Sequence, residues 1–149
     1  MEETINFIIE LAKKQHLNVN GTLDLRPLLK NLNPVIKNNL KGAFEILFKQ
    51  GVFKNANDIP QLTEAGFQKI YGNIEQQMEE TINFIIELAK KQHLNVNGVL
   101  DLRLLVQNLN PVIKNNQKDA FEILFKQGVF ENVNETPRLT EAGFQKIYK

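Results

Sequence analysis

The sequence repeats itself with a period of 77 residues. When residues 1–71 are aligned with residues 78–148, 60 positions are identical, and the first 21 positions match without exception. This period is too long for a stacked solenoid repeat, whose units hold about 20–45 residues, and it suits a small self-contained domain. We therefore expect two copies of one domain, over residues 1–72 and 78–149, joined by a connector at 73–77.

The composition excludes several classes of protein. The chain of 149 residues has no cysteine, which rules out disulfides, thiolate zinc sites and cysteine nucleophiles. No apolar run approaches the roughly 20 residues that span a bilayer, and the N-terminal Met-Glu-Glu-Thr is acidic where a signal peptide is basic. We expect a cytoplasmic protein without a membrane partner. The net charge of +1 is weak support for nucleic-acid binding, because many nucleic-acid-binding domains are plainly basic.

The stretch from Asn33 to Phe53 predicts a helix, Pro34 to Gln50, followed by a short strand. Asn33 is a favoured N-cap, and proline suits the first helical position because its missing N–H is not needed there. Gly51 ends the helix, since glycine readily adopts a positive φ. Apolar residues at steps of three and four form one stripe. The stripe holds Ile36, Leu40, Ala43, Phe44 and Leu47, and the polar side holds Lys37, Asn38, Lys41, Glu45 and Lys49.

Residues Glu2 to Gln15 predict the first helix. Acidic residues at its start and lysines at its end match the helix dipole. Ile5, Ile8, Ile9 and Ala12 form a core stripe, and two further residues widen the apolar arc to about 200° at 100° per residue. This arc exceeds what one small core covers, so we infer a second burial partner, either the other copy or another chain. The residues concerned are Phe7 and Leu11, with Phe84 and Leu88 in the second copy.

Between these two helices the sequence predicts a turn at residues 18–21, a short strand at Thr22-Leu23 and a helix from Leu25 to Leu32. Asp24 is placed to cap that helix. We expect Leu28, Leu29 and Leu32 to face the core. The short break at Asn33-Pro34 gives two helices joined by a tight turn.

After Val52-Phe53, the polar residues 54–60 predict a hairpin tip, and Gln61-Leu62 predicts the returning strand. Thr63 is placed to cap a last helix, Glu64 to Tyr71. Gly66 in the first turn of this helix costs up to about 1 kcal/mol relative to alanine. Close packing against a neighbouring backbone would explain the glycine.

The connector allows two interpretations. Apolar residues keep a spacing of three or four from Phe67 across the connector to Ala89, which is compatible with one helix from Glu64 to about Gln92 and Gly72 as its weak point. The alternative is a loose six-residue linker. We favour the continuous or kinked helix.

The pattern of each copy resembles the winged helix-turn-helix superfamily, and especially its MarR-like and PadR-like regulators, whose wing ends in a similar Leu-Thr-x-x-Gly. The resemblance covers about Leu23 to Tyr71. It rests on Leu29, Leu32, Val35, Leu40, Phe44, Leu47, Gly51-Val52-Phe53, Leu62-Thr63-Glu64-Ala65-Gly66 and Ile70.

The resemblance implies a mainly α fold with small β-wings (α+β): two tandem winged helices, each with about three helices, a short hairpin and a C-terminal helix. The Pro34 to Gln50 helix would be the recognition helix, with its outward N-terminal residues in the DNA major groove. Two such domains in one chain would form a pseudo-dimer that reads half-sites about one helical turn apart, as in a transcription regulator. The DNA contacts implied are Lys37, Asn38, Asn39, Lys41 and Lys54, with Lys114, Asn115, Asn116 and Lys118 in the second copy.

The two copies differ in charge near this implied DNA face. Lys54 corresponds to Glu131, Gly42 to Asp119 and Lys30 to Gln107, while only the change from Gln61 to Arg138 adds positive charge. These differences weaken the DNA interpretation for the second copy. In addition, Leu40 corresponds to Gln117. A buried, unpaired amide costs about 1–3 kcal/mol, so we expect this position to be peripheral.

No residue pattern indicates an enzyme, a cofactor or a metal site. Each copy holds one histidine, His16 or His93, at a helix end, which favours capping or solvent exposure. The carboxylates lie at helix starts or on polar faces, and there is no phosphate-binding glycine loop. The alternative to DNA binding is a protein-binding module on the same frame, such as an assembly adaptor or a phage-type inhibitor of a host nucleoprotein. That module could form oligomers and would use the first helix.

Overall fold

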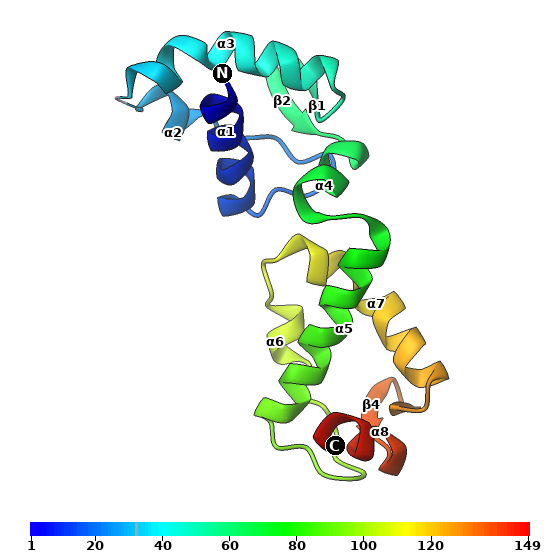
Figure 1. Ribbon diagram of the computed structural model, residues 1–149. Helices are drawn as coiled ribbons and strands as arrows, with labels where there is room; N and C mark the ends of the chain where they lie inside the picture. The colour runs from blue at the N-terminus through cyan, green and yellow to red at the C-terminus, as the bar shows by residue number, and fades with distance from the viewer. Residues whose placement is uncertain (32) are drawn as a thin grey trace. The chain divides into compact units, whose positions relative to one another are not determined.

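A computed structural model describes residues 1–31 and 33–149 of the chain (Figure 1). The described residues divide into two compact units, Met1–Asn73 (unit 1) and Ile74–Lys149 (unit 2). They form a mixed α/β structure of eight helices and two antiparallel two-stranded hairpins. Unit 1 holds α1 (Glu2–Lys14), α2 (Arg26–Leu29), α3 (Pro34–Lys49), β1 (Phe53–Ala56), β2 (Ile59–Leu62) and α4 (Glu64–Tyr71). Unit 2 holds α5 (Ile74–Lys91), α6 (Arg103–Val106), α7 (Pro111–Lys126), β3 (Phe130–Val133), β4 (Thr136–Leu139) and α8 (Glu141–Tyr148).

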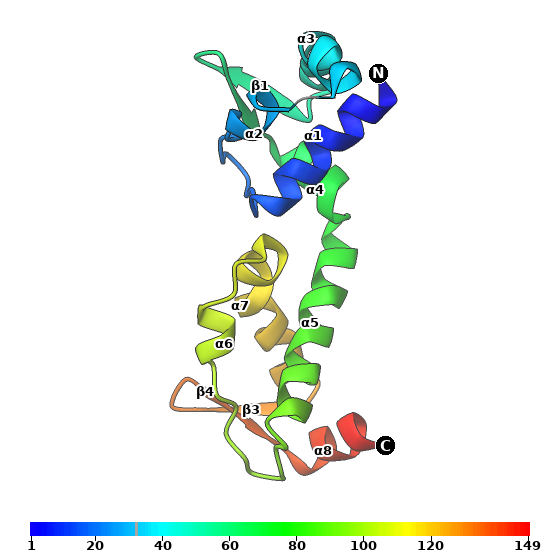
Figure 2. The same cartoon turned by 90° about the vertical axis from the view of Figure 1, so that its left-hand side faces the viewer.

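The core of each unit lies between its first long helix, its third helix and its hairpin. In unit 1, α1 packs against α3, and in unit 2, α5 packs against α7 (Figures 1 and 2). The stripe predicted for α3 is only partly buried, because Leu40 and Phe44 lie at its edge and are half-exposed. Gln117 is half-exposed as well, as an amide at that position requires. The fully buried large side chains of unit 1 include Ile8, Leu28, Ile36, Leu47, Phe53, Leu62 and Phe67.

The second helix is shorter than the sequence indicates. It spans only Arg26–Leu29 instead of Leu25 to Leu32, and α6 is equally short. Asn31 offers the backbone an alternative to helix, because its side-chain oxygen accepts the N–H of Asn33 at 2.8 Å. A single turn can bury only one side, so Leu28 is buried while Leu29 is 71% exposed, and its predicted core position is wrong. Leu32 lies outside the described residues.

The hairpins are longer and their tips tighter than predicted. β1 pairs with β2 from Phe53 opposite Leu62 to Ala56 opposite Ile59, so the connection is only Asn57-Asp58. Both turn residues have positive φ, 54° and 66°, as a type I′ turn requires. Thr22 adds a single bridge to Gln61, which is all that forms of the predicted strand there.

The prediction for Gly66 is confirmed. A Cβ at this position would lie 2.0 Å from the carbonyl oxygen of Val52, and a Cβ at Gly143 would lie at the same distance from the Val129 oxygen. Thr63 caps α4, because its Oγ1 accepts the N–H of Gly66 at 2.9 Å. The start of the last helix is therefore pressed against the backbone that leads into the hairpin.

The predicted continuous helix from Glu64 to about Gln92 is wrong. α4 ends at Tyr71, Gly72 adopts φ 102°, and α5 begins at Ile74. A helix cannot pass through a residue with positive φ, and glycine adopts that conformation at low cost. Residues 74–77 of the connector are helical, as the favoured interpretation predicts, and form the first turn of α5, while the break falls at Gly72 and Asn73.

Candidate nucleic-acid interface

The N-terminal half of α3 presents its basic side chains on the face opposite the core. The Asn33 side chain accepts the N–H of Val35 at 2.9 Å and Pro34 follows it, which fixes where the helix begins. From this start, Ile36 points into the core, and Lys37, Asn38 and Lys41 are exposed. α7 repeats the arrangement, with Asn110 as the cap and Lys114, Asn115 and Lys118 exposed.

The second asparagine of each pair is placed differently from the first. Asn39 is half-buried, and its Nδ2 donates to the carbonyl of Val35, one turn earlier, at 2.8 Å. Asn116 makes the same bond to Val112 and a second one, at 3.2 Å, to Oε1 of Gln77. A side-chain amide reads adenine by donating and accepting together, so a donor already bonded to its own helix is poorly placed for it. The structure thus brings together Lys37, Asn38 and Lys41, without Asn39.

Lys54 lies on the hairpin rather than on the helix. It is exposed at the base of β1, directly opposite Gln61 of β2. The corresponding pair in unit 2 is Glu131 and Arg138, whose side chains form an ion pair, with Arg138 Nε donating to Glu131 Oε1 at 2.6 Å. At this pair of positions, the unit 1 hairpin therefore carries a lysine opposite an uncharged glutamine. The unit 2 hairpin carries a glutamate and an arginine whose charges cancel.

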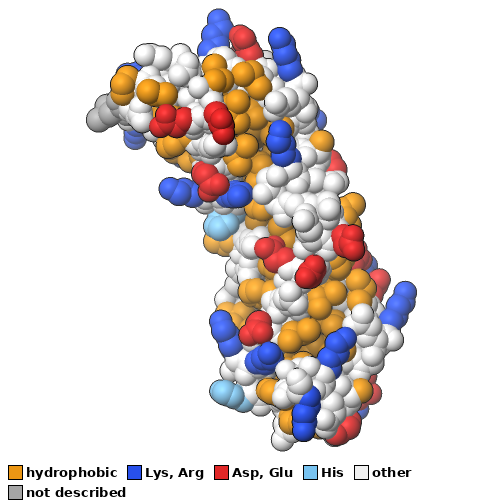
Figure 3. All heavy atoms as spheres, in the orientation of Figure 1, with side chains coloured by type: hydrophobic (Ala, Val, Ile, Leu, Met, Phe, Trp, Pro, Cys, Tyr) orange, Lys and Arg blue, Asp and Glu red, His pale blue; other side chains and the backbone are white. Residues whose placement is uncertain are grey.

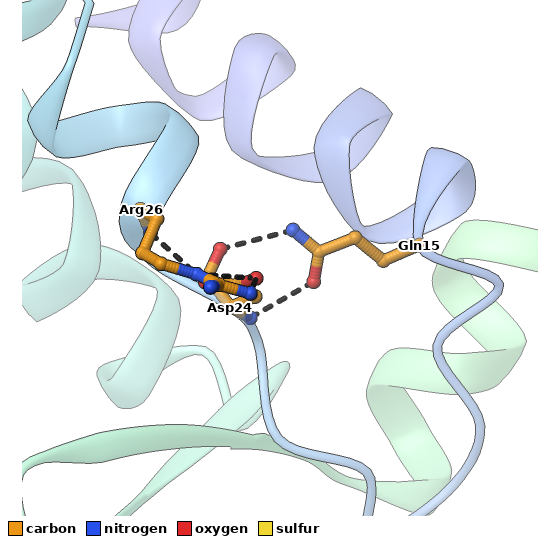
Figure 4. Close-up of polar contacts among 3 residues, drawn as sticks. All are labelled: Gln15, Asp24 and Arg26. Atoms are coloured by element: carbon orange, nitrogen blue, oxygen red, sulfur yellow. Dashed lines mark hydrogen bonds and ion pairs between the residues drawn. The ribbon is translucent and has the colours of Figure 1, made fainter.

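The arginine that begins the second helix of each unit is also paired with a carboxylate. Arg26 Nη2 lies 2.6 Å from Oδ2 of Asp24, although the arginine side chain is 81% exposed. Gln15 holds the backbone of Asp24 on both sides, donating from Nε2 to its carbonyl and accepting its N–H (Figure 4). Hydrogen bonds from the Arg26 side chain and backbone lower the pKa of the Asp24 carboxyl from 3.8 to about 2. Arg103 and Asp101 repeat the pair at 2.5 Å. These arginines add little net charge to the basic face.

The Asp24 carboxyl gives a direct test of this pair. Its pKa is depressed, so the pair favours the folded state above about pH 3.8 and loses that contribution as the pH falls towards 2. In Arg26→Gln, we expect the Asp24 pKa to rise towards 3.8, as followed by carboxyl-carbon NMR. Asp101 in the same chain keeps Arg103 and is the internal control. An unchanged Asp24 pKa would show that the arginine does not hold the carboxylate.

The four apolar residues proposed for a partner interface lie beside two similar shallow grooves. Leu11 and Leu88 are buried within their own units, and Phe7 and Phe84 are half-buried. The inferred second burial partner is therefore needed for the phenylalanines far more than for the leucines. The groove in unit 1, about 90 Å³, is lined by Phe7, Glu10, Leu11 and Lys14. The groove in unit 2, about 110 Å³, is lined by Phe84, Glu87, Leu88, Lys91 and Leu104.

The structure also contains a groove that the sequence did not predict and that is larger than the two grooves on α1 and α5. It lies in unit 2 between α7 and the β3–β4 hairpin, has a volume of about 290 Å³, and has Phe121 and Phe125 in its wall. The sequence signal was present, since Phe44-x-x-x-Phe48 and its repeat place two aromatics one turn apart on the edge of the apolar stripe. That spacing does not show that the hairpin lies beside the two aromatic rings and forms the other wall of the groove.

Charges of both signs surround these features. On the face of the molecule in Figure 3, basic and acidic side chains are interspersed over both units. Within residues 1–31 and 33–149, no cluster of three or more His, Cys, Asp or Glu side chains could hold a metal ion. None of the helices in the same ranges combines the length and the apolarity needed to cross a membrane. His16 and His93 occupy positive-φ positions at the ends of α1 and α5.

Comparison with known proteins gives no assignment: no family model, no curated protein and no solved structure matches this chain.

Proposed function

We propose that the chain is a DNA-binding protein built from two tandem winged helices, with α3 and α7 as recognition helices and the two hairpins as wings. The order of elements supports this proposal, because a helix, a short helix, a long helix, a hairpin and a last helix follow one another in each unit. The observation that carries it is the exposed group Lys37, Asn38 and Lys41 on α3, together with an exposed Lys54 at the base of the proposed wing.

The two units contribute unequally in this proposal. Unit 1 carries Lys30 and Lys54 near the basic face, where unit 2 carries Gln107 and the neutralised Glu131. Unit 2 also gains the exposed Asp119 on α7, next to Lys118. Because phosphate contacts supply most of the sequence-independent affinity, unit 1 dominates binding and unit 2 adds a weaker contact.

A matched pair of charge reversals tests the proposal. We expect Lys37→Glu combined with Lys41→Glu to weaken binding to duplex DNA at least about tenfold and to lower the log–log salt slope by about 2, since each phosphate contact contributes about 0.9. Lys114→Glu combined with Lys118→Glu changes the same charges in unit 2 and should have the smaller effect. Fluorescence anisotropy on random and selected duplexes across a salt series measures both quantities.

Two results would contradict this proposal. The first is the absence of binding at low salt, where non-specific electrostatic affinity is strongest. The second is equal affinity of the native chain and the unit 1 charge-reversal variant. A larger loss from the unit 2 variant would contradict the unequal division between the units.

The second candidate is a protein-binding module, such as an assembly adaptor or an inhibitor of a nucleoprotein. It is favoured by the similar grooves on α1 and α5, where a half-buried phenylalanine shares the lining with a glutamate and a lysine in each unit. Under this proposal, Phe7→Ser abolishes capture of a partner from a native extract while the Lys37→Glu, Lys41→Glu variant retains it. The reverse result favours DNA binding.

A further inference from the structure

The groove between α7 and the β3–β4 hairpin has an aromatic wall. Phe121 and Phe125 are half-exposed and lie one helical turn apart, with ring centroids 6.0 Å apart and ring planes at 26°. Leu102, which precedes α6, and the buried Pro137 of β4 complete the apolar lining. Aromatic faces carry a negative quadrupole, so they attract cations as well as apolar groups. A wall of this kind suits the aliphatic stem of a long cationic side chain.

The charged residues in the lining favour the same ligand. Glu122 on α7 and Glu135 in the hairpin turn both line the groove. Neither takes part in an ion pair or a side-chain hydrogen bond with the residues that the structure describes, in contrast to Glu131, which pairs with Arg138. With Lys118 as the third charged residue, the lining has a net charge of −1. A purely apolar ligand would desolvate these carboxylates without pairing them, which is costly.

The repeat keeps the lining of this groove while four other positions of the hairpin change. Of the eight lining positions, seven are identical in unit 1, and the eighth holds Asp58 in place of Glu135, which retains the carboxylate. By contrast, the outward pair on the same hairpin changes from Lys54 and Gln61 to Glu131 and Arg138. The equivalent lining in unit 1 consists of Leu25, Lys41, Phe44, Glu45, Phe48, Asn55, Asp58 and Pro60.

We propose that the groove between α7 and the β3–β4 hairpin binds an arginine or lysine side chain of a protein partner. The stem lies against Phe121 and Phe125, and the charge lies between Glu122 and Glu135. This inference goes beyond DNA binding and does not depend on it. Lys118 belongs both to the basic face of α7 and to the groove lining, so the two sites meet at this side chain. The two carboxylates repel phosphate and keep DNA away from the aromatic wall.

A pair of blocked tripeptides tests the proposal on the full chain. Acetyl-Leu-Arg-Leu-amide carries the guanidinium, and acetyl-Leu-citrulline-Leu-amide is the same size and shape without the charge. We expect the arginine peptide to shift the backbone NMR signals of Phe125, Glu135 and Thr136 and to bind at least about fivefold more tightly than the citrulline peptide, because about 1 kcal/mol separates them. Glu135 and Thr136 differ from their unit 1 counterparts, so their signals report on this groove alone.

Charge-neutral variants complete the test. Glu122→Gln combined with Glu135→Gln changes two exposed side chains without altering the core, and it should weaken the arginine peptide about tenfold while leaving the citrulline peptide unaffected. Glu79→Gln combined with Glu80→Gln removes the same charge from α5 and should leave both affinities unchanged. Equal binding of the two peptides, signal shifts confined to residues outside this groove and its unit 1 counterpart, or an equal loss in the α5 control would each overturn the proposal.

The same variants separate this inference from DNA binding. Removing Glu122 and Glu135 lowers affinity for the cationic peptide, and it leaves DNA affinity unchanged or raises it through the loss of negative charge. The unit 1 lysine reversals have no effect on the α7 groove. Failure of DNA binding therefore leaves the peptide result intact, and failure of peptide binding leaves the DNA result intact.

Discussion

Gly66→Ala is expected to destabilise unit 1 by about 3 kcal/mol or more, although alanine is the better helix former. The added methyl carbon would lie 2.0 Å from the Val52 carbonyl oxygen and 2.8 Å from its carbon, where real Cβ atoms are essentially never found. Both contacts are to backbone, so no side chain can rotate away. Either α4 must move off the hairpin or the Val52 peptide must shift, and both changes open a packed core.

The expected loss is large compared with the free energy of unfolding of a unit of this size. A domain of about 70 residues is stable by roughly 4–11 kcal/mol, so a loss of 3 kcal/mol removes a large share of it. Amide hydrogen exchange should show α1, α3 and the β1–β2 hairpin losing protection, whereas unit 2, where Gly143 is unchanged, is the reference in the same chain. The control is Ala65→Gly at the neighbouring exposed position, where propensity alone costs about 1 kcal/mol. Equal or greater stability of Gly66→Ala would show that the close approach to Val52 is not a constraint.

The sequence predicted best where a local signal and burial agree. Asn33-Pro34 and Thr63 specify helix starts by their own hydrogen bonds, and the structure shows both bonds. Gly66 was informative because it broke a local rule, and such violations mark places where tertiary packing sets the residue. The duplication itself guided the interpretation, since every element of one unit has a counterpart in the other.

The errors came from signals that extend only along the chain. Leu29 fitted the apolar spacing of a longer helix, but the Asn31 side chain redirects the backbone and leaves this leucine exposed. Apolar residues keep a helical spacing from Phe67 across the connector to Ala89. That spacing depends on side chains alone and does not show that the backbone of Gly72 adopts φ 102°, which ends the helix. A single backbone angle at Gly72 thus outweighed a regular pattern over more than 20 residues.

The candidate sites show the same division. Sequence periodicity placed Lys37 and Lys41 correctly on an outer face, because burial of Ile36 fixes the rotation of α3. Periodicity could not show that Asn39 folds back onto Val35, since that depends on the competition of a side-chain amide for a backbone carbonyl. Nor could it show the α7 groove, whose second wall is contributed by a hairpin about ten residues further along the chain.

Thr63→Val should destabilise unit 1 by about 2–3 kcal/mol while preserving the shape of the side chain. The Thr63 hydroxyl accepts the N–H of Gly66 at 2.9 Å and donates towards the carbonyls of Gly51 and Val52. Valine removes the helix cap, worth about 1–2 kcal/mol, and leaves a half-buried carbonyl without its donor, at about 1 kcal/mol more. The same hydroxyl therefore fixes both the end of α3 and the start of α4.

Thr63→Ser separates the hydroxyl from the methyl group, because serine keeps the hydrogen bonds and loses only one carbon. We expect serine to cost well under half as much as valine in the free energy of unfolding, measured by urea denaturation. Since Gly51 follows α3 and Val52 precedes β1, loosening this junction also frees the β1–β2 hairpin relative to α3. Under the proposed DNA-binding function, Thr63→Val should weaken DNA binding where unit 1 remains folded, and Thr140→Val, its counterpart in unit 2, should weaken it less. If the valine and serine variants prove equally stable, the hydroxyl does not hold the junction, and the position of the β1–β2 hairpin must come from packing at Gly66 alone.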